Sequence, residues 1–220
     1  MFLSWKGSDM KKFFLLTGMV LITGVANADP TYYASVKMGG GNTTVYQGDT
    51  KLGDYFVQNG FKFDSSGGLL LEISPAVGID WILNSKGWLH FRLEGELGYN
   101  HYRENIKLKD DTDSYSLTIK SDQIFFLANG YMDFRIKKFA LYAGLGFGYS
   151  WGDIAIRDNN DGSNEPVDAN GGIYALHFGL AYKYSDITTF DLGCRRVYAP
   201  AEDDGQYVFD TIRLGFRFRI

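Results

Sequence analysis

The chain has 220 residues, of which 45% are hydrophobic, 16% aromatic and 22% charged, and its formal net charge at pH 7 is -4. This acidic balance excludes a protein that binds nucleic acid through a basic surface. The single cysteine, Cys194, excludes an internal disulfide framework. The length is that of one domain.

The N-terminus has the pattern of a secretory signal peptide. Two lysines follow Met10 and precede a short apolar run that ends in the motif Ala-Asn-Ala. A basic start, a short apolar core and a small-x-small site are typical of a segment removed after export. We predict a signal peptide over residues 1–28, of which 1–9 are a non-native or misassigned start, and one domain over residues 29–220.

The remaining chain contains eight segments in which apolar and polar residues alternate. Alternation with a period of two predicts strands that have one face in an apolar medium and the other in a polar medium. No apolar run of about 18 residues follows the leader, so no helical membrane span is predicted. The predicted strands cover 32–38, 69–81, 88–100, 124–136, 139–151, 174–184, 188–198 and 212–220.

The two faces of these strands differ in side-chain size as well as in polarity. One face carries Leu, Ile, Phe, Tyr and Trp, whereas the other carries Gly, Ala and Ser mixed with charged residues. The interior of an eight-stranded barrel is just wide enough for side chains to fill, so the small and charged face must point inward. The predicted fold class is therefore all-β: an eight-stranded antiparallel up-and-down transmembrane β-barrel with its apolar face outward.

Aromatic residues and connections support this prediction. Rings at both ends of an apolar band form the girdle expected at the two lipid–water interfaces. The connections alternate between tight turns, at 84–87, 137–138 and 185–186, and long polar links, which we predict as extracellular loops at 42–66, 103–114, 157–171 and 199–206. The predicted girdle residues are Trp81, Tyr99, Tyr149, Trp151, Tyr174, Tyr182 and Tyr184.

Fourteen charged or titratable residues fall on the predicted inner face. Both signs are represented, which favours a network of paired charges that plugs the lumen over a selectivity ring of one sign. A small porin-like diffusion channel is the alternative. The predicted lumen residues are Lys37, Glu72, Asp80, His90, Arg92, Glu94, Glu96, Asp133, Arg135, His177, Asp191, Arg195, Arg213 and Arg217.

No catalytic, metal or cofactor site is predicted. The histidines His90, His101 and His177 lie in no nucleophile–histidine–carboxylate motif, so a lipid A-modifying enzyme is the less favoured alternative. The acidic link 157–171 lacks a glycine at the sixth position of an EF-hand loop, which indicates a surface loop. Cys194 shares the parity of the apolar face and is expected to face lipid.

The last eight residues, 213–220, resemble the terminal β-signal of bacterial outer-membrane barrels. The resemblance rests on Gly215, Phe218 and Ile220, although phenylalanine is commoner than isoleucine at the last position. Residues 29–220 as a whole resemble the eight-stranded OmpA/OmpX-like family, which includes opacity-type surface antigens.

This resemblance implies a location and a set of partners. The location is the bacterial outer membrane. The partners are outer-membrane lipid and lipopolysaccharide, the barrel-assembly machinery and periplasmic chaperones during biogenesis, and a host or surface ligand of the loops, with no nucleic acid. The implied role is structural or surface-interacting, adhesin- or antigen-like, and not enzymatic.

Overall fold

The computed structural model describes residues 30–47, 50–58, 62–65, 68–109, 114–160, 163–200 and 205–220. The predicted signal peptide lies outside these residues. No helix within the described ranges is long and apolar enough to cross a membrane.

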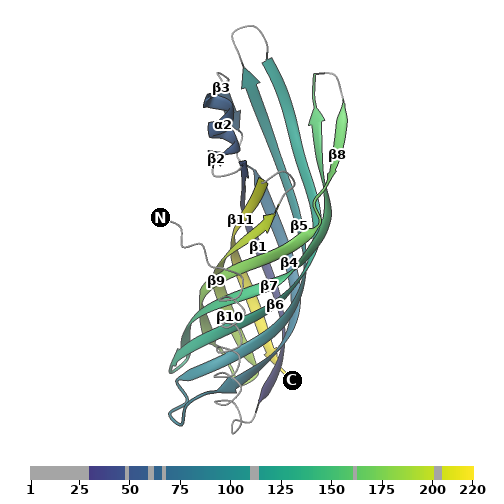
Figure 1. Cartoon of the computed structure of the whole chain (residues 1–220). Coiled ribbons are helices and arrows are strands. Elements are labelled where there is room, and N and C mark those ends of the chain that lie inside the picture. Colours follow the sequence, from purple (N-terminus) through teal and green to yellow (C-terminus); the bar gives the residue numbers. More distant parts are fainter. Residues whose placement is uncertain are drawn as a thin grey trace, which may run out of the picture.

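Eight long antiparallel strands close into a barrel (Figure 1). They pair in the order β1-β4-β5-β6-β7-β9-β10-β11, and β11 pairs back to β1. This ring confirms the predicted eight-stranded up-and-down topology. The elements in chain order are β1 (Thr31–Gln47), β2 (Thr50–Lys51), α2 (Leu52–Gln58), β3 (Lys62–Ser65), β4 (Leu69–Ile82), β5 (Leu89–Lys109), β6 (Ser114–Ile136), β7 (Phe139–Asp158), β8 (Asn164–Asp168), β9 (Gly171–Lys183), β10 (Thr188–Pro200) and β11 (Gly205–Arg219).

The ring closes through β1, which pairs along both of its edges. Its register with β11 runs from Tyr33 opposite Arg219 to Gln47 opposite Gly205. On its other edge it pairs with β4 up to Gly41. A closed ring leaves no open sheet edge, so its backbone groups are satisfied without water.

Several strands are longer than the sequence predicted, and the predicted loops are correspondingly too long. Strand β5 continues to Lys109 and β6 begins at Ser114, so most of 103–114 is a strand hairpin. Strands β7 and β8 likewise take up much of 157–171, β10 and β11 take up both ends of 199–206, and β1, β2, α2 and β3 take up much of 42–66. At 103–109 the prediction failed because the outward face becomes polar and charged while the period of two continues, and such residues are also typical of loops.

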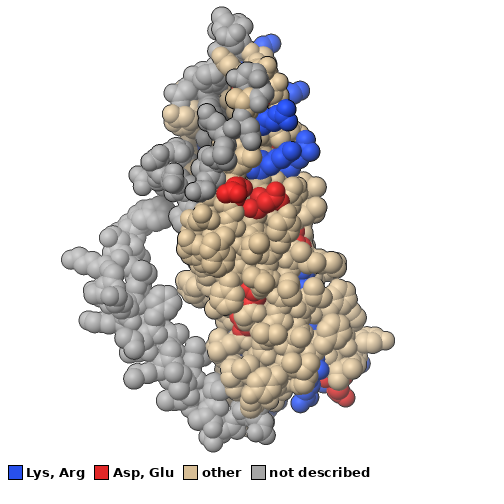
Figure 2. Space-filling model, turned by 90° about the vertical axis from the view of Figure 1, so that its right-hand side faces the viewer, with Lys and Arg blue, Asp and Glu red and all other residues tan. Residues whose placement is uncertain are grey.

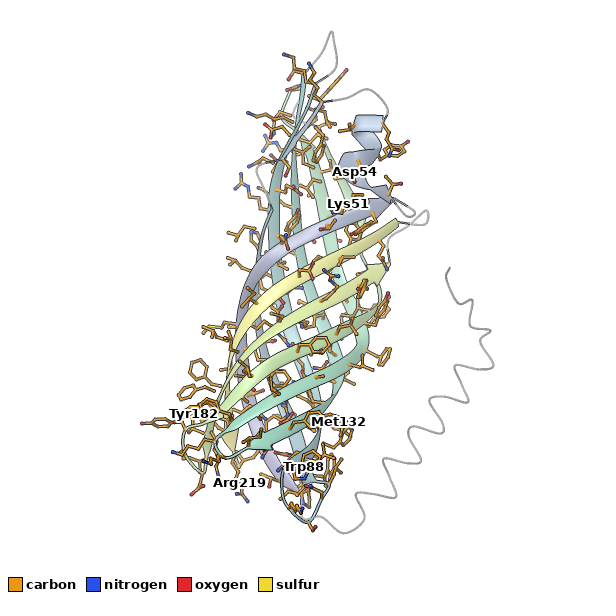
Figure 3. The ribbon with its side chains drawn as sticks, turned by 90° about the vertical axis from the view of Figure 1, so that its left-hand side faces the viewer. Lys51, Asp54, Trp88, Met132, Tyr182 and Arg219 are labelled. Atoms are coloured by element: carbon orange, nitrogen blue, oxygen red, sulfur yellow. The ribbon has the colours of Figure 1, made fainter. Side chains whose placement is uncertain are left out.

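The opposite end of the barrel has short turns. Residues 84–87 form one of them, in which the Asn84 side chain accepts hydrogen bonds from the backbone N–H groups of Trp88 and Leu89 at 3.1 and 3.0 Å. Gly87 has a φ of 68°, in the left-handed region that favours glycine. Figure 3 shows Trp88 and Tyr182 at this end, and Lys51 and Asp54 at the other.

The strand period separates two surfaces of opposite character. On β4, from Leu69 to Val77, the odd positions are exposed, as at Val77 (63%), and the even positions are buried, as at Ser74. Large aliphatic and aromatic side chains are exposed in this way on all eight strands of the ring. The apolar surface of the barrel therefore faces outward, and small and charged side chains face inward behind it, as predicted.

Candidate functional site

The barrel lumen is the candidate site. The structure places all fourteen predicted residues on the inner face, most of them buried and Asp80, Arg135 and Asp191 partly buried. Six are cationic, six are anionic and two are histidines, so the network is electrically balanced when the histidines are neutral. Buried charges need such balance, because an unpaired ion in a low-dielectric interior is costly.

Glu96 is the centre of the network. Its carboxylate is fully buried and accepts hydrogen bonds from Lys37 Nζ at 2.8 Å, Arg195 Nη1 at 3.0 Å, Arg213 Nη1 at 3.1 Å and Asn129 Nδ2 at 3.0 Å. These donors come from β1, β10, β11 and β6. One carboxylate on β5 is thus bonded to four other strands of the ring.

Glu72 and His177 join the same cluster around Glu96, and together these residues form the first of two ionic layers in the lumen. Glu72 accepts from Arg195 and, at 3.4 Å, from Arg213. His177 Nδ1 lies 2.8 Å from Arg213 Nη2, and its Nε2 lies 3.1 Å from the side-chain oxygen of Asn129. The neutral tautomer with its proton on Nε2 satisfies both contacts. Both ring nitrogens are therefore already engaged.

A second ionic layer lies nearer the short turns. Arg92 Nε bonds the Asp133 carboxylate at 2.9 Å, and Arg217 makes a bidentate pair with Asp191 at 2.7 and 2.8 Å. Bidentate guanidinium–carboxylate pairs are among the strongest hydrogen-bonded ion pairs in proteins. The remaining predicted residues join this layer: Glu94 accepts from Lys37, and Asp80 pairs with Arg135 and with His90.

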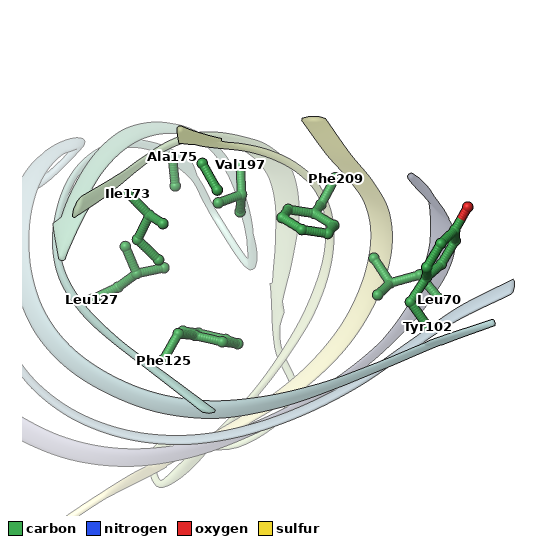
Figure 4. Close-up of a cluster of buried hydrophobic side chains, with 9 residues drawn as sticks. Leu70, Tyr102, Phe125, Leu127, Ile173, Ala175, Val197 and Phe209 are labelled. Atoms are coloured by element: carbon green, nitrogen blue, oxygen red, sulfur yellow. The ribbon is translucent and has the colours of Figure 1, made fainter. Parts of the chain in front are cut away.

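An apolar layer, which the sequence analysis missed, fills the lumen beyond the ionic layers (Figure 4). It occupies the interior toward the long hairpins. Phe125 is 2% exposed, and Leu70 and Leu127 are fully buried. The cluster comprises Leu70, Tyr102, Phe125, Leu127, Ile173, Ala175, Val197, Ala199 and Phe209.

Glycine makes room for these rings. A Cβ at Gly98 would lie 2.0 Å from the Phe125 ring. The sequence does carry a signal for the apolar layer, since 69–71 and 124–127 are apolar without interruption and so break the alternation.

Small cavities lie among the lumen side chains. One, of about 20 Å³, lies among Lys37, Arg92, Asp191 and their neighbours, and another, of about 10 Å³, lies beside Phe125. Each is about the size needed for one water molecule.

The predicted girdle residues fall into two groups on the outer face. Near the long hairpins are Tyr99, Tyr149, Trp151 and Tyr174; near the short turns are Trp81, Tyr182 and Tyr184. Their rings contact one another or neighbouring aromatic rings. The ring centroids of Tyr149 and Trp151 are 4.9 Å apart, and those of Trp81 and its neighbour Phe91 are 6.0 Å apart.

The belt between the two groups has the height of a bilayer core. On β6 it runs from Ile124, level with Trp151, to Phe134, which stacks on Trp88. Ten residues at about 3.3 Å, tilted by about 40°, give a height of about 25 Å.

The residues of the predicted assembly signal have structural places as well. Phe218 and Ile220 point outward, with exposed fractions of 46% and 77%. Gly215 lies between Lys37 and Asp191 on the neighbouring strands, where a Cβ would come within 3.3 Å of both side chains. Glycine at this position leaves room for the lumen network.

At the margin of the apolar belt, the Asp122 carboxylate is held by side-chain contacts from β5. Asp122 accepts from the Tyr99 hydroxyl, and His101 Nδ1 lies 2.8 Å from its Oδ1. These hydrogen bonds lower the pKa of Asp122. No group of three His, Cys, Asp or Glu residues in the described ranges is arranged to hold a metal ion. Cys194 is exposed on the outer face, and the acidic residues 202–204 lie outside the described residues.

Comparison with known proteins finds similar structures but no similar sequences. No protein-family model and no curated protein matches the sequence. Among solved structures, the outer membrane protein OprG from Pseudomonas aeruginosa matches with a TM-score of 0.47 and 13% identity, over 88% of this chain and 98% of that one.

Two further matches are similar in extent. Neisserial surface protein A matches with a TM-score of 0.46 and 15% identity, over 87% of this chain and 99% of its own. The outer membrane protease OmpT from Escherichia coli matches with a TM-score of 0.41 and 9% identity, over 86% and 97%. At these TM-scores the fold assignment rests on the chain's own pairing: an eight-stranded up-and-down β-barrel with its apolar face outward.

Proposed function

We propose that the protein is an integral β-barrel of the bacterial outer membrane whose lumen is plugged and which acts through its outer surface, as a structural or surface-interaction protein. The observation that carries this proposal is the combination of an apolar belt outside with two ionic layers and an apolar layer inside. A soluble barrel has the reverse arrangement, because its apolar side chains must avoid water.

Membrane insertion follows from the belt and the closed ring. The exposed side chains between the two aromatic groups are almost all apolar, and an exposed apolar surface of this extent is unstable in water. The predicted signal peptide supplies the export that such a location requires. The barrel-assembly machinery and periplasmic chaperones are the partners we propose for biogenesis.

A plug accounts for the lumen better than a diffusion channel does. A conducting pore needs a water-filled path, whereas the cavities among the charged lumen residues and beside Phe125 have volumes of about 20 and 10 Å³. Moving ions through it would require separation of pairs such as Arg92–Asp133 and displacement of the Phe125 ring. The charge network therefore serves to fill and stabilise the barrel.

The long hairpins are where an interaction at the surface would take place. Strands β5 and β6 continue ten residues beyond the level of Tyr99 and Ile124, and β3, α2 and β8 lie at the same end. A host or surface ligand would meet this part of the chain first. We propose no enzymatic role, because the ring nitrogens of the buried His90 and His177 contact Asp80, the Gly87 carbonyl, Asn129 and Arg213 rather than a hydroxyl or thiol nucleophile.

Single-channel recording in planar bilayers tests the proposal. We expect the refolded protein, shown to be inserted by its resistance to proteolysis in vesicles, to give no steady openings. Steady openings that are abolished by Arg92→Gln or Glu94→Gln would contradict the plug and favour the channel. Expression that alters lipid A, detected by mass spectrometry, would favour an enzyme instead. A mature protein that stays in solution without detergent would contradict membrane insertion.

A further inference from the structure

Three basic side chains form an exposed group on the outer wall of the long hairpins. Arg103 on β5, Lys120 on β6 and Arg157 on β7 are exposed and occupy neighbouring strands. We call these three residues the basic face. Figure 2 shows Lys and Arg side chains gathered above a broad surface of uncharged residues, with acidic side chains at its margin.

The pairing within the basic face is unfavourable in isolation. Arg103 lies directly opposite Lys120, and Arg157 lies opposite Thr118, two residues along β6 from Lys120. Directly opposed side chains have Cβ atoms about 5 Å apart, and like charges in this position destabilise a sheet. None of the three residues has a carboxylate within 4 Å in the described part of the chain, whereas the outward-facing Arg196 on β10 is paired with Asp210.

The nearest acidic side chains offset the basic face only in part, because two carboxylates stand against three cations. Asp122 and Asp153 lie opposite one another one outward position nearer the belt, and Asp122 interacts electrostatically with Lys120 as well as accepting hydrogen bonds from neighbouring side chains. Further out on the same face of β5, beyond Asn105, the next charge is again basic, at Lys107, four residues from Arg103. An external anion would therefore relieve the repulsion within the basic face.

The height of the basic face selects the kind of anion. Arg103 follows Tyr99, in the aromatic row, by four residues, which is about 13 Å along the strand and about 10 Å along the barrel axis. The polar headgroup layer of a bilayer is about 5–7 Å thick on each side. Arg and Lys side chains extend several ångströms from the backbone and bend toward charged layers, so they reach this depth.

The same three strands are hollowed below the aromatic row. A groove of about 1110 Å³ lies over the outer wall and extends from these strands to their neighbours β4 and β9; its lining includes the small residues Gly95, Ala128, Gly130 and Ala143 and the large apolar residues Leu93 and Phe147. These small residues belong to β5, β6 and β7, as does the basic face. One wall therefore presents an apolar groove at the depth of acyl chains and cations at the depth of headgroups.

We propose that the basic face binds the phosphate groups of an outer-leaflet lipid of the lipid A type, with an acyl chain in the groove beneath it. The inference rests on the proposed membrane location. A membrane lipid satisfies both features of the wall at once, whereas a soluble polyanion would use the cations and leave the groove unexplained. Arg103 and Lys120 supply the charge-assisted hydrogen bonds to phosphate.

Lipid retention by the purified barrel tests this inference. The refolded full-length protein in detergent is titrated with bisphosphorylated lipid A and with the same lipid A after removal of its phosphates, and bound lipid is counted by native mass spectrometry. The double variant Arg103→Gln, Lys120→Gln should bind the phosphorylated lipid about 30-fold more weakly, since each cation near an anionic surface contributes about 1 kcal/mol. The control variant Lys86→Gln, Lys138→Gln removes two exposed charges from the short turns and should bind as the unaltered protein does.

Each outcome decides the matter. Loss of affinity on removal of the phosphates and also on removal of the two cations, together with weaker binding at high salt, supports the inference. Equal binding of the two lipids, or equal binding by the double variant, overturns it; so does tight binding of a soluble polysulfate or of inorganic phosphate without binding of lipid A. Should the double variant not fold, the comparison of the two lipids on the unaltered protein still decides. Failure of the unaltered protein to insert into vesicles would contradict the membrane location itself, whereas insertion without lipid A retention would contradict only this inference.

Discussion

The substitution Glu96→Gln tests whether the lumen network stabilises the barrel. It removes one negative charge from a network of six cations and six anions and leaves a buried net positive charge. Breaking a buried ion pair by removal of one partner costs about 3–5 kcal/mol. Three of the four donors to Glu96 keep other acceptors, since Lys37 still meets Glu94, and Arg195 and Arg213 still meet Glu72.

The glutamine also keeps one oxygen that can accept a hydrogen bond. The loss should therefore lie at the lower end of this range, at about 3 kcal/mol. That corresponds to a decrease of about 100-fold in the folding equilibrium constant.

Denaturant titration in lipid vesicles measures this effect. The free energy of unfolding of Glu96→Gln is compared with that of the unaltered protein, with tryptophan fluorescence as the signal. Asp186→Asn, in an exposed turn, is the control and should change stability by less than about 0.5 kcal/mol. The double variant Glu96→Gln, Lys37→Met restores electrical balance and should recover part of the loss. A change below about 0.5 kcal/mol for Glu96→Gln would refute the reasoning, because it would mean that the lumen charges are solvated in the folded protein.

Three further predictions concern packing and the margin of the belt. Leu127→Ala should destabilise the barrel by about 2–5 kcal/mol in the same titration, because Leu127 is fully buried in the apolar layer; a smaller loss would mean that the layer is loosely packed. Gly148→Ala should prevent folding, because the added Cβ would lie 1.7 Å from a backbone oxygen of β6. The control Gly95→Ala should fold, because the atom nearest to its added Cβ is 3.8 Å away. Equal yields of folded protein for the two variants, measured by heat-modifiable gel mobility, would contradict the register of β6 and β7. Tyr99→Phe should raise the pKa of Asp122 in a carbon-13 titration. In the unaltered protein the Tyr99 hydroxyl donates a hydrogen bond that stabilises the charged carboxylate, and the variant lacks this donor. In the unaltered protein the folded-state pKa of Asp122 is lowered, so the stability that Asp122 contributes is present above its unfolded-state pKa and is lost as the pH falls through its folded-state pKa. An unchanged titration of Asp122 in the variant would refute the contact with Tyr99.

The sequence predicted the architecture because barrel geometry is encoded locally. Every second residue of a strand faces the same side, so the sorting of Val77 outward and Ser74 inward could be inferred without tertiary information. The volume argument then decided which face is inside, since an eight-stranded ring has little room for large side chains. The same alternation placed all fourteen charged or titratable residues on the inner wall.

The extent of the hairpins could be inferred only in part. Residues 103–109 keep the period of two, but their outward side chains are charged, and charge is also typical of loops. The structure decides for a strand, because β5 pairs with β6 out to Lys109. The backbone hydrogen bonds of a strand are made with a neighbouring strand, and the sequence of 103–109 alone does not show which segment that neighbour is.

The sequence by itself determined the number of strands, their inside and outside faces and the balance of charge within the barrel. Only the tertiary structure decided which charges meet, as in the convergence of four donors on Glu96, because these donors lie 33 to 117 residues away in sequence. It also revealed the apolar layer around Phe125 and the basic face on β5, β6 and β7. Strand register sets these contacts, and register depends on the pairing of whole strands rather than on the pattern within any one of them.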